Sequence, residues 1–352
     1  MKVFRVGADY AINVMVRYDN FSLYSAIPVE VDQLKFLQNL QTEKYINVIF
    51  WTKPSKLHYE VQFIINPSDK ELFMERAEHF KLNVTLLQPN IQQAFDNQII
   101  KKYLGFKIDN YTWEYYHTLE DIYHWLSDLT IKYPKIVQLY VIGKSVEGRE
   151  IYALIIKRGK SKNKIIVEGG IHGREWISVE FVTYLAAQIL NANDTNRRVV
   201  KLFRSHDWLL IPVANPDGFN YNQKEDRLFK KNRNVGGGLN GVDLNRNFDY
   251  SFGKHAVGRH ILDDDYCGST PFSEPETVAL KRFLQQHSEN LKFYFSIHSY
   301  GQRIVIPFAD RVNHMSNYFE LENYGKQAAT EMFNYTAKNT KLGLYMTRWV
   351  SF

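Results

Sequence analysis

One feature limits the possible folds of this chain more than any other. It is a short apolar segment that ends at two glycines and is followed by a helix. Ile165 to Val167 is typical of a buried strand, and apolar residues at helical spacing resume near Ser178. His172 and Glu175 lie in the turn between them, three residues apart. An imidazole and a carboxylate at this spacing can bind one Zn²⁺ and leave other positions open. Such a pair is more often simply solvated, so the interpretation requires a third ligand elsewhere.

The remainder of the second half of the chain supplies a candidate for that ligand. Strands alternate with helices there, which predicts an α/β fold with a doubly wound, mixed, mostly parallel sheet and helices on both faces. His298 follows an expected strand, 291–297, just as His172 follows its own strand. Ligands of such sheets bind at the carboxyl ends of the strands. We therefore expect His172, Glu175 and His298 to meet at one edge. Further strands are expected at 137–142, 151–156, 164–168 and 208–213, and helices at 119–129, 178–190, 274–287 and 318–334.

The first hundred residues form a separate pattern. Four strand-like segments and two helix-like segments follow one another in the order β-α-β-β-α-β, which predicts a small ferredoxin-like α+β open sandwich. The composition shifts after it, at a polar segment that includes Lys101-Lys102. We expect an accessory domain at 1–90, a connecting segment at 91–109 and a larger domain at 110–352.

Composition excludes several classes of protein. The chain has 352 residues and a formal net charge of +6, but its basic residues are spread along the sequence, which argues against nucleic-acid binding. A single cysteine, Cys267, permits no disulfide within the chain. Apolar runs are too short to span a membrane. The segment 1–18 contains Asp9, Asn13 and Arg17 and makes a poor signal peptide.

Arginines near the expected metal site suit an anionic substrate. Arg174 lies inside the His-x-x-Glu segment, and Asn245-Arg246 occurs in a second polar segment. Arginine is a natural two-pronged partner for a carboxylate. Taken singly, each of these arginines is more often a structural ion-pair former.

Four segments together resemble the zinc metallocarboxypeptidases of the A/B type, especially insect digestive procarboxypeptidases. They occur in the order of that family, and the resemblance covers nearly the whole chain. By this resemblance His172, Glu175 and His298 bind one Zn²⁺, and Asn245 and Arg246 hold the C-terminal carboxylate of a peptide. Arg174 and Tyr300 line the cleft, and the first hundred residues are an inhibitory pro-region. The four segments are Ile171-His172-Gly173-Arg174-Glu175-Trp176, Asn215-Pro216-Asp217-Gly218, Val242-Asp243-Leu244-Asn245-Arg246-Asn247 and Ser296-Ile297-His298-Ser299-Tyr300.

Two departures from the family pattern matter for catalysis. Lys230 stands where the family places an arginine that stabilises the oxyanion, and lysine keeps the charge without the planar fork. The family's general-base Glu and its mobile Tyr come from a segment that this sequence, ending at Phe352, does not reach. General-base help is worth about 10² to 10⁴-fold, so impaired hydrolysis is expected of the chain as given. The sheet is expected to have an exposed edge where later strands pair.

Three functions follow from these patterns. The first is a zinc carboxypeptidase zymogen that removes C-terminal amino acids from peptides. The second is an inert short form that binds zinc and peptide C termini or a protein partner. The third is a zinc amidohydrolase of N-acyl amino acids. The resemblance further implies secretion, a monomer, and activation by a trypsin-like protease near Lys101-Lys102.

Overall fold

The structure, a computed structural model, describes residues 15–41, 43, 45–98, 100, 111–192, 197–235, 240–254, 260–300, 303–308 and 315–338. The chain divides into two compact units, Met1–Lys101 with Lys224–Arg227, and Lys102–Gln223 with Leu228–Phe352. The expected cleavage site at Lys101-Lys102 lies outside the described residues. The finer boundaries at 90 and 109 therefore stay predictions.

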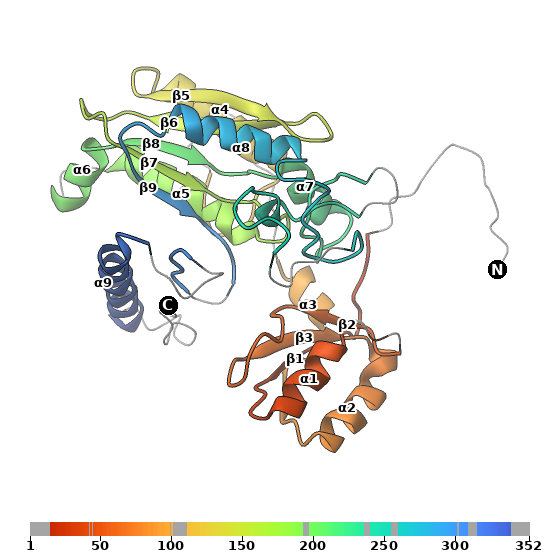
Figure 1. Cartoon of the computed structure of the whole chain (residues 1–352). Coiled ribbons are helices and arrows are strands. Elements are labelled where there is room, and N and C mark those ends of the chain that lie inside the picture. Colours follow the sequence, from red (N-terminus) through yellow and green to blue (C-terminus); the bar gives the residue numbers. More distant parts are fainter. Residues whose placement is uncertain are drawn as a thin grey trace, which may run out of the picture. The chain divides into compact units, whose positions relative to one another are not determined.

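The first unit is the open sandwich that the sequence predicts (Figure 1). Its strands form one antiparallel sheet in the order β2-β3-β1-β4. Phe63 on the sheet and Phe36 and Phe73 on the two helices pack in one core, so a single face of the sheet is covered. The elements are β1 (Ser22–Ala26), α1 (Val31–Asn39), β2 (Val48–Phe50), β3 (Val61–Ile65), α2 (Lys70–His79), β4 (Val84–Gln88) and α3 (Ile91–Asp96).

The second unit is built on a mixed five-stranded sheet in the order β5-β6-β8-β7-β9. β7 runs parallel to both β8 and β9, whereas β6 runs antiparallel to β5 and β8. The mixed sheet agrees with the prediction, and its parallel part is the part that carries the expected ligands. Its elements are α4 (Leu119–Lys132), β5 (Val137–Lys144), β6 (Glu150–Ile156), β7 (Lys164–Glu168), α5 (Trp176–Asn191), α6 (Arg197–Arg204), β8 (Asp207–Ile211), α7 (Pro216–Lys224), α8 (Pro275–Gln286), β9 (Leu291–Ser296) and α9 (Tyr318–Lys338).

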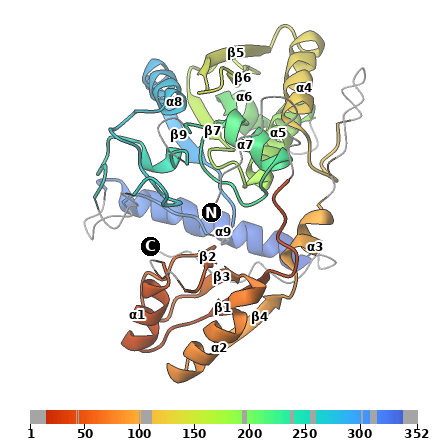
Figure 2. The same ribbon diagram turned by 90° about the vertical axis from the view of Figure 1, so that its right-hand side faces the viewer.

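Helices cover both faces of this sheet. Figure 2 shows α8 on one side of the strands and α4 and α5 on the other. Ala153 of β6 is buried in a core with Leu280 and Phe283 of α8. Residues of the strands that lie outside this core, such as Leu154 and Val167, are buried as well. Burial on both faces explains why these strands read as continuous apolar runs.

Two helices are not among those that the sequence predicts. Pro216 begins helix α7 where the segment 214–218 carries the signals of a turn, because proline is well tolerated in the first turn of a helix. Helix α6 is absent from the elements that the sequence predicts, since its basic residues hide the two apolar positions, Val200 and Phe203, that it buries.

β9 lies at the edge of the sheet among the strands that the structure describes. Phe295 on this strand is 46% exposed. The exposed edge that the sequence predicts for the whole chain stays a prediction, because residues 309–314 and 339–352 lie outside the described ranges. Within the described ranges, no helix is both long and apolar enough to cross a membrane.

A buried carboxyl at the start of α8 makes the stability of the second unit depend on pH. Glu276 is fully buried and accepts hydrogen bonds from the backbone N–H of Val146 (3.0 Å) and from Nδ2 of Asn232 (3.1 Å). Burial raises its pKa from 4.5 to about 7, and the charge of Asp217 adds to this. A raised pKa in an acid means that its contribution is fully present below about pH 4.5 and is lost as the pH rises through about 7.

We expect E276Q to remove this part of the pH dependence. Ionisation of Glu276 costs at most about 3 kcal/mol of unfolding free energy. Denaturant unfolding of the native chain and of E276Q at pH 5 and pH 8 measures the effect, because other titrating groups cancel in the difference between the two proteins. The variant should gain relative stability at pH 8. An identical difference at both pH values would show that Glu276 does not titrate in this range.

Candidate metal centre

The turn between β7 and α5 is shaped by its glycines. Gly170 has φ 63°, a conformation that side chains disfavour, and a Cβ there would lie 2.8 Å from Cγ2 of Val179. Its N–H donates to Oγ of Ser178 (3.0 Å), which ties the turn to the first turn of α5. The strand therefore bends sharply onto the helix. This bend places His172 and Glu175 directly beyond the carboxyl end of β7.

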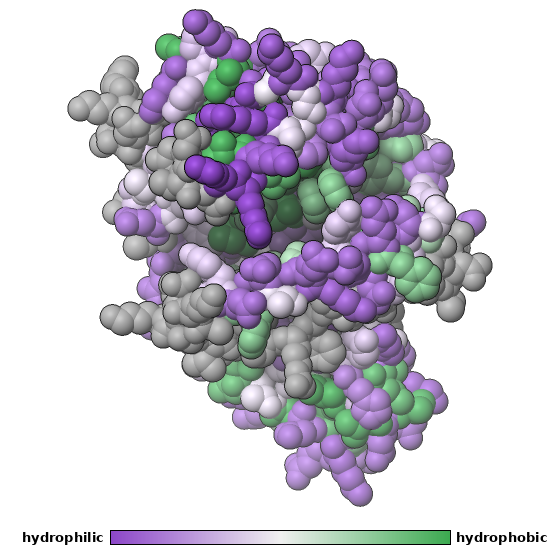
Figure 3. Space-filling view, turned by 90° about the vertical axis from the view of Figure 1, so that its left-hand side faces the viewer, coloured by the Kyte–Doolittle hydropathy of each residue, from purple (hydrophilic) through white to green (hydrophobic). Residues whose placement is uncertain are grey.

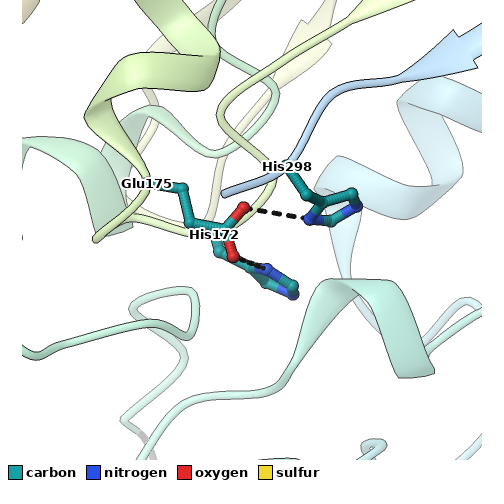
Figure 4. Close-up of side chains that lie close together, drawn as sticks. All are labelled: His172, Glu175 and His298. Carbon is teal, nitrogen blue, oxygen red and sulfur yellow. Dashed lines mark hydrogen bonds and ion pairs between the residues drawn. The ribbon is translucent and has the colours of Figure 1, made fainter. Parts of the chain in front are cut away.

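Three side chains meet at this edge of the sheet (Figure 4). Candidate donor atoms of His172, Glu175 and His298 all lie within 4.8 Å of one another. Nδ1 of His172 lies 2.8 Å from Oε1 of Glu175, and Nδ1 of His298 lies 2.9 Å from Oε2 of the same carboxylate. β7 and β9 pair in parallel, so their carboxyl ends lie side by side and bring these residues together, as the sequence predicts.

The other nitrogen of each imidazole has a hydrogen-bond partner of its own. Nε2 of His172 lies 3.1 Å from Oδ1 of Asp243, and Nε2 of His298 lies 3.1 Å from Oγ of Ser296. Asp243 can accept a hydrogen bond from Nε2 of His172, and the hydroxyl of Ser296 can accept from or donate to Nε2 of His298. In this structure each Nδ1 faces the Glu175 carboxylate, and a proton on Nε2 alone would free the Nδ1 lone pair for a metal ion. Such outer partners fix the tautomer and orientation of histidine ligands. Two imidazoles and one carboxylate with a position left open are the donor set of a catalytic zinc site.

Buried charge is balanced within this cluster. Burial alone raises the pKa of Glu175, but hydrogen bonds from His172 and His298 outweigh it and lower the pKa to about 2. Burial also acts against the ionised Asp243, whose pKa is nevertheless held well below its usual range by Lys230 and His172. The carboxylate of Glu175 is thus kept ionised, as a metal ligand must be.

Lys230 is engaged beside the metal centre. Its Nζ lies 2.6 Å from Oδ2 of Asp243, and its side chain is 11% exposed. It therefore contacts His172 through Asp243 in this structure. A role for Lys230 at the oxyanion, as the sequence suggests, requires the ammonium to turn away from this carboxylate.

The candidate substrate residues surround the same edge. Nδ2 of Asn245 lies 3.4 Å from Nε2 of His298, and the exposed Arg246 donates to the backbone oxygen of Asn245 (3.1 Å). Arg174 pairs with Asp264 (3.4 Å). Surrounding protein raises the pKa of the Tyr300 hydroxyl, and the charge of Arg174 offsets part of that rise. All four residues thus lie near the metal cluster.

Sequence reasoning missed the outer partners of the two histidines. Asp243 caps the short helix Leu244–Arg246 by accepting from the N–H of Asn245 (3.0 Å) while it faces His172. Glu168, the last residue of β7, is fully buried and accepts from Oγ of Ser296 (3.0 Å). A carboxylate that ends a buried strand directly before the His-x-x-Glu turn was a usable signal for Glu168.

Comparison with known families identifies the chain. The family described as "Zinc carboxypeptidase" matches residues 122–350, and the family described as "Carboxypeptidase activation peptide" matches residues 24–98. The chain belongs to the zinc carboxypeptidase family. It is therefore related to hydrolases that use zinc, and it carries an activation peptide, which makes it a zymogen that a protease activates.

Individual relatives agree with this family. "Zinc carboxypeptidase A 1" of Anopheles gambiae is 32% identical over 322 residues, which span 91% of this chain and 74% of the relative. "Carboxypeptidase B2" of Bos taurus is 30% identical over 322 residues, which span 88% of this chain and 75% of the relative. These two relatives bear A-type and B-type names, so the matches do not choose between the specificities.

Solved zinc carboxypeptidases share the fold. The structure of thrombin activatable fibrinolysis inhibitor superposes with a TM-score of 0.82 at 28% identity, covering 91% of this chain and 82% of that one. Carboxypeptidase A of Helicoverpa armigera gives a TM-score of 0.78 at 23% identity, covering 90% of this chain and 78% of that one, and supports the fold alone.

Proposed function

We propose that this zinc carboxypeptidase binds one zinc ion through His172, Glu175 and His298 and releases the C-terminal residue of peptides. The observation that carries the proposal is the meeting of three donor side chains within 4.8 Å, just beyond the carboxyl ends of two parallel strands, with both outer imidazole nitrogens partnered. A bound zinc ion supplies Lewis-acid activation of the scissile carbonyl and of water.

The residues of this chain orient the peptide at that centre. Asn245 and Arg246 are placed to bind the terminal carboxylate, because one lies beside His298 and the other is exposed next to it. A guanidinium and an amide together recognise a carboxylate through several charge-assisted hydrogen bonds. A clamp of this kind confines cleavage to the last peptide bond. Arg174 and Tyr300 lie close to the metal ligands in sequence, and we assign them to contacts with the part of the peptide that precedes its last bond.

Asp243 and Lys230 support the ligand set. Asp243 holds the proton of His172 on Nε2, and Lys230 balances the buried charge of Asp243. If Lys230 also reaches the oxyanion, the lysine provides one donor where an arginine fork provides two. This substitution is expected to lower the rate, since loss of one oxyanion donor costs about 10² to 10³-fold.

We also propose that the activation peptide is removed by a trypsin-like protease at or near Lys101-Lys102 and that the protein acts outside the cell. The basic doublet follows the matched activation peptide, which ends at residue 98. The resemblance to digestive procarboxypeptidases supports the extracellular location.

The test combines metal content with product analysis. The purified chain, before and after trypsin, is loaded with zinc, assayed for bound metal and incubated with peptides that end in a free carboxylate or an amide. We expect about one zinc per chain and release of one amino acid at a time from the free-carboxylate peptides only, abolished by a chelator. Zinc and peptide binding without release would favour the inert short form. Preferential cleavage of N-acyl amino acids would favour the amidohydrolase.

A further inference from the structure

Basic residues that are scattered in the sequence lie together at one end of the strands in the second unit's sheet. This end carries the first residues of β7, β8 and β9 and is opposite the end that carries the metal centre. β7, β8 and β9 begin there, because Lys164 pairs in register with Asp207 and with Leu291. The N–H of Lys157 donates to the backbone oxygen of Ile136, so the end of β6 and the start of β5 meet at the same edge. The last turn of helix α6 lies against the same end of the strands. Gly159, just after β6, packs so closely on Arg204 that a Cβ on the glycine would lie 1.9 Å from the backbone oxygen of Arg204.

We call this surface the basic edge. All of its cationic side chains are exposed except that of Lys164, which is half-buried. The segments 130–137, 156–164, 197–208 and 286–291 contain two carboxylates, Asp207 and Glu289. Asp207 is itself largely covered and pairs with Lys157 at 4.0 Å. The basic edge consists of Lys132, Lys135, Lys157, Lys160, Lys162, Lys164, Arg197, Arg198, Lys201 and Arg204.

The positive charges act together on neighbouring groups. Burial lowers the pKa of His287, and the charges of Lys164 and Lys157 lower it further. The same two lysines act on Asp207, where they oppose the rise in pKa that burial causes. Lys157 and Lys164 therefore lie close enough together to act on the same two groups, His287 and Asp207.

Helix α6 forms a ridge of this surface. Arg197, Lys201 and Arg204 recur at helical spacing, and together with Val200 and Ser205 they line a shallow hollow. Figure 3, which looks onto the side of the molecule where α6 lies, shows strongly hydrophilic side chains standing out from this face. Val200 and Phe203 are buried, so the helix packs against the rest of the unit and its cationic side chains lie on the exposed face.

We propose that the basic edge binds a sulfated polysaccharide. A polyanion with regularly repeated charges fits an array of exposed cations and gains free energy by releasing its counterions. The aromatic residues on these segments, Phe203 and Trp208, are buried, and Tyr133 is half-buried, so the described surface offers no stacking platform for nucleotide bases. Sulfated polysaccharides are also the polyanions that meet extracellular proteins, and this choice rests on the proposed extracellular location.

Because the basic edge and the metal centre lie at opposite edges of one sheet, polysaccharide binding should leave the metal site accessible. Removal of the activation peptide should leave this surface in the enzyme, since all of it belongs to the second unit. The consequence would be retention of the enzyme near a sulfated matrix without inhibition.

Heparin, as the probe, tests the proposal against a variant with matched charge. R197Q/R198Q/K201Q removes three exposed cations from α6, and K35Q/K144Q/K254Q removes three exposed cations elsewhere. Heparin affinity is measured by calorimetry across a range of salt concentrations. We expect the α6 variant to bind at least about 10-fold more weakly and to show a salt slope smaller by up to about 3, while the control variant changes little.

Several outcomes would overturn the inference. Equal losses in the two variants would mean that net charge alone is responsible. Equal affinity for desulfated heparin would exclude recognition of sulfate groups. Tighter binding of duplex DNA, or of vesicles containing phosphatidylserine, would assign the surface to another class of partner. Zinc content and peptide binding of the α6 variant are measured in parallel and should equal those of the native chain, so failure of the carboxypeptidase assignment is recognised separately.

Discussion

Replacing His298 with alanine is expected to lower zinc affinity by at least about 10³-fold. The variant removes one of two imidazole donors and leaves a carboxylate and a single histidine, too few protein ligands for a catalytic zinc site. The side chain of His298 is 31% exposed, so its loss creates little cavity and the fold should persist. Competition with a chromophoric chelator measures the dissociation constant directly.

A second histidine provides the control for this experiment. H124A replaces an exposed histidine on α4, in the same unit but away from the ligand set, and should bind zinc as the native chain does. The thermal midpoint of the native chain should rise on addition of zinc, and that of H298A should not, because a ligand stabilises only the state that binds it. Unchanged zinc affinity in H298A would remove this residue from the ligand set.

D243N tests the outer partner by the same measurement. An asparagine keeps the size of Asp243 but weakens the acceptor for Nε2 of His172 and leaves Lys230 without its counter-charge. Outer partners of this kind typically contribute 10 to 100-fold to metal affinity. We therefore expect a smaller loss for D243N than for H298A, and the reverse order would mean that the roles of ligand and outer partner have been assigned wrongly.

The position of the three candidate ligands was predictable from sequence, because ligands of mostly parallel α/β sheets bind at the carboxyl ends of the strands. His172 and His298 each follow an apolar strand, and parallel strands bring their carboxyl ends to one edge. The open-sandwich fold of the first unit was likewise predictable, since its order of strands and helices is local, whereas its role as an activation peptide came from the family resemblance. Both predictions depend on patterns within short segments.

The outer partners and the basic edge escaped prediction because they depend on pairing between distant segments. Asp243 faces His172 across 71 positions of sequence, and nothing near either residue specifies that contact. Ser296 has no signal beyond its place in a strand. The basic residues of α6 and of the segment 157–164 appear as dispersed surface charge in the sequence, and only the fold brings Gly159 of that segment against Arg204 of the helix. Register and packing, rather than composition, create both features.

Replacing Arg246 with glutamine should weaken binding of peptides with a free C terminus by about 10² to 10³-fold. The guanidinium is the charged half of the proposed clamp, and removal of one partner from a charged hydrogen-bonded pair costs about 2 to 5 kcal/mol. Binding to the zinc-loaded chain is measured by fluorescence anisotropy with a labelled peptide and with its C-terminal amide. The amide should bind the native chain weakly, and R246Q should bind the two peptides about equally.

Two further variants separate the charge of Arg246 from its geometry. R246K retains the charge but loses the planar fork and should give an intermediate affinity. R282Q removes an exposed arginine from α8 and should behave as the native chain does. If R246Q still prefers the free carboxylate as strongly as the native chain, the clamp lies elsewhere, and Arg174, which Asp264 already partly neutralises, becomes the next candidate. If the preference disappears while zinc affinity is unchanged, recognition of the C terminus and binding of the metal are separable properties of neighbouring residues on one edge of the sheet.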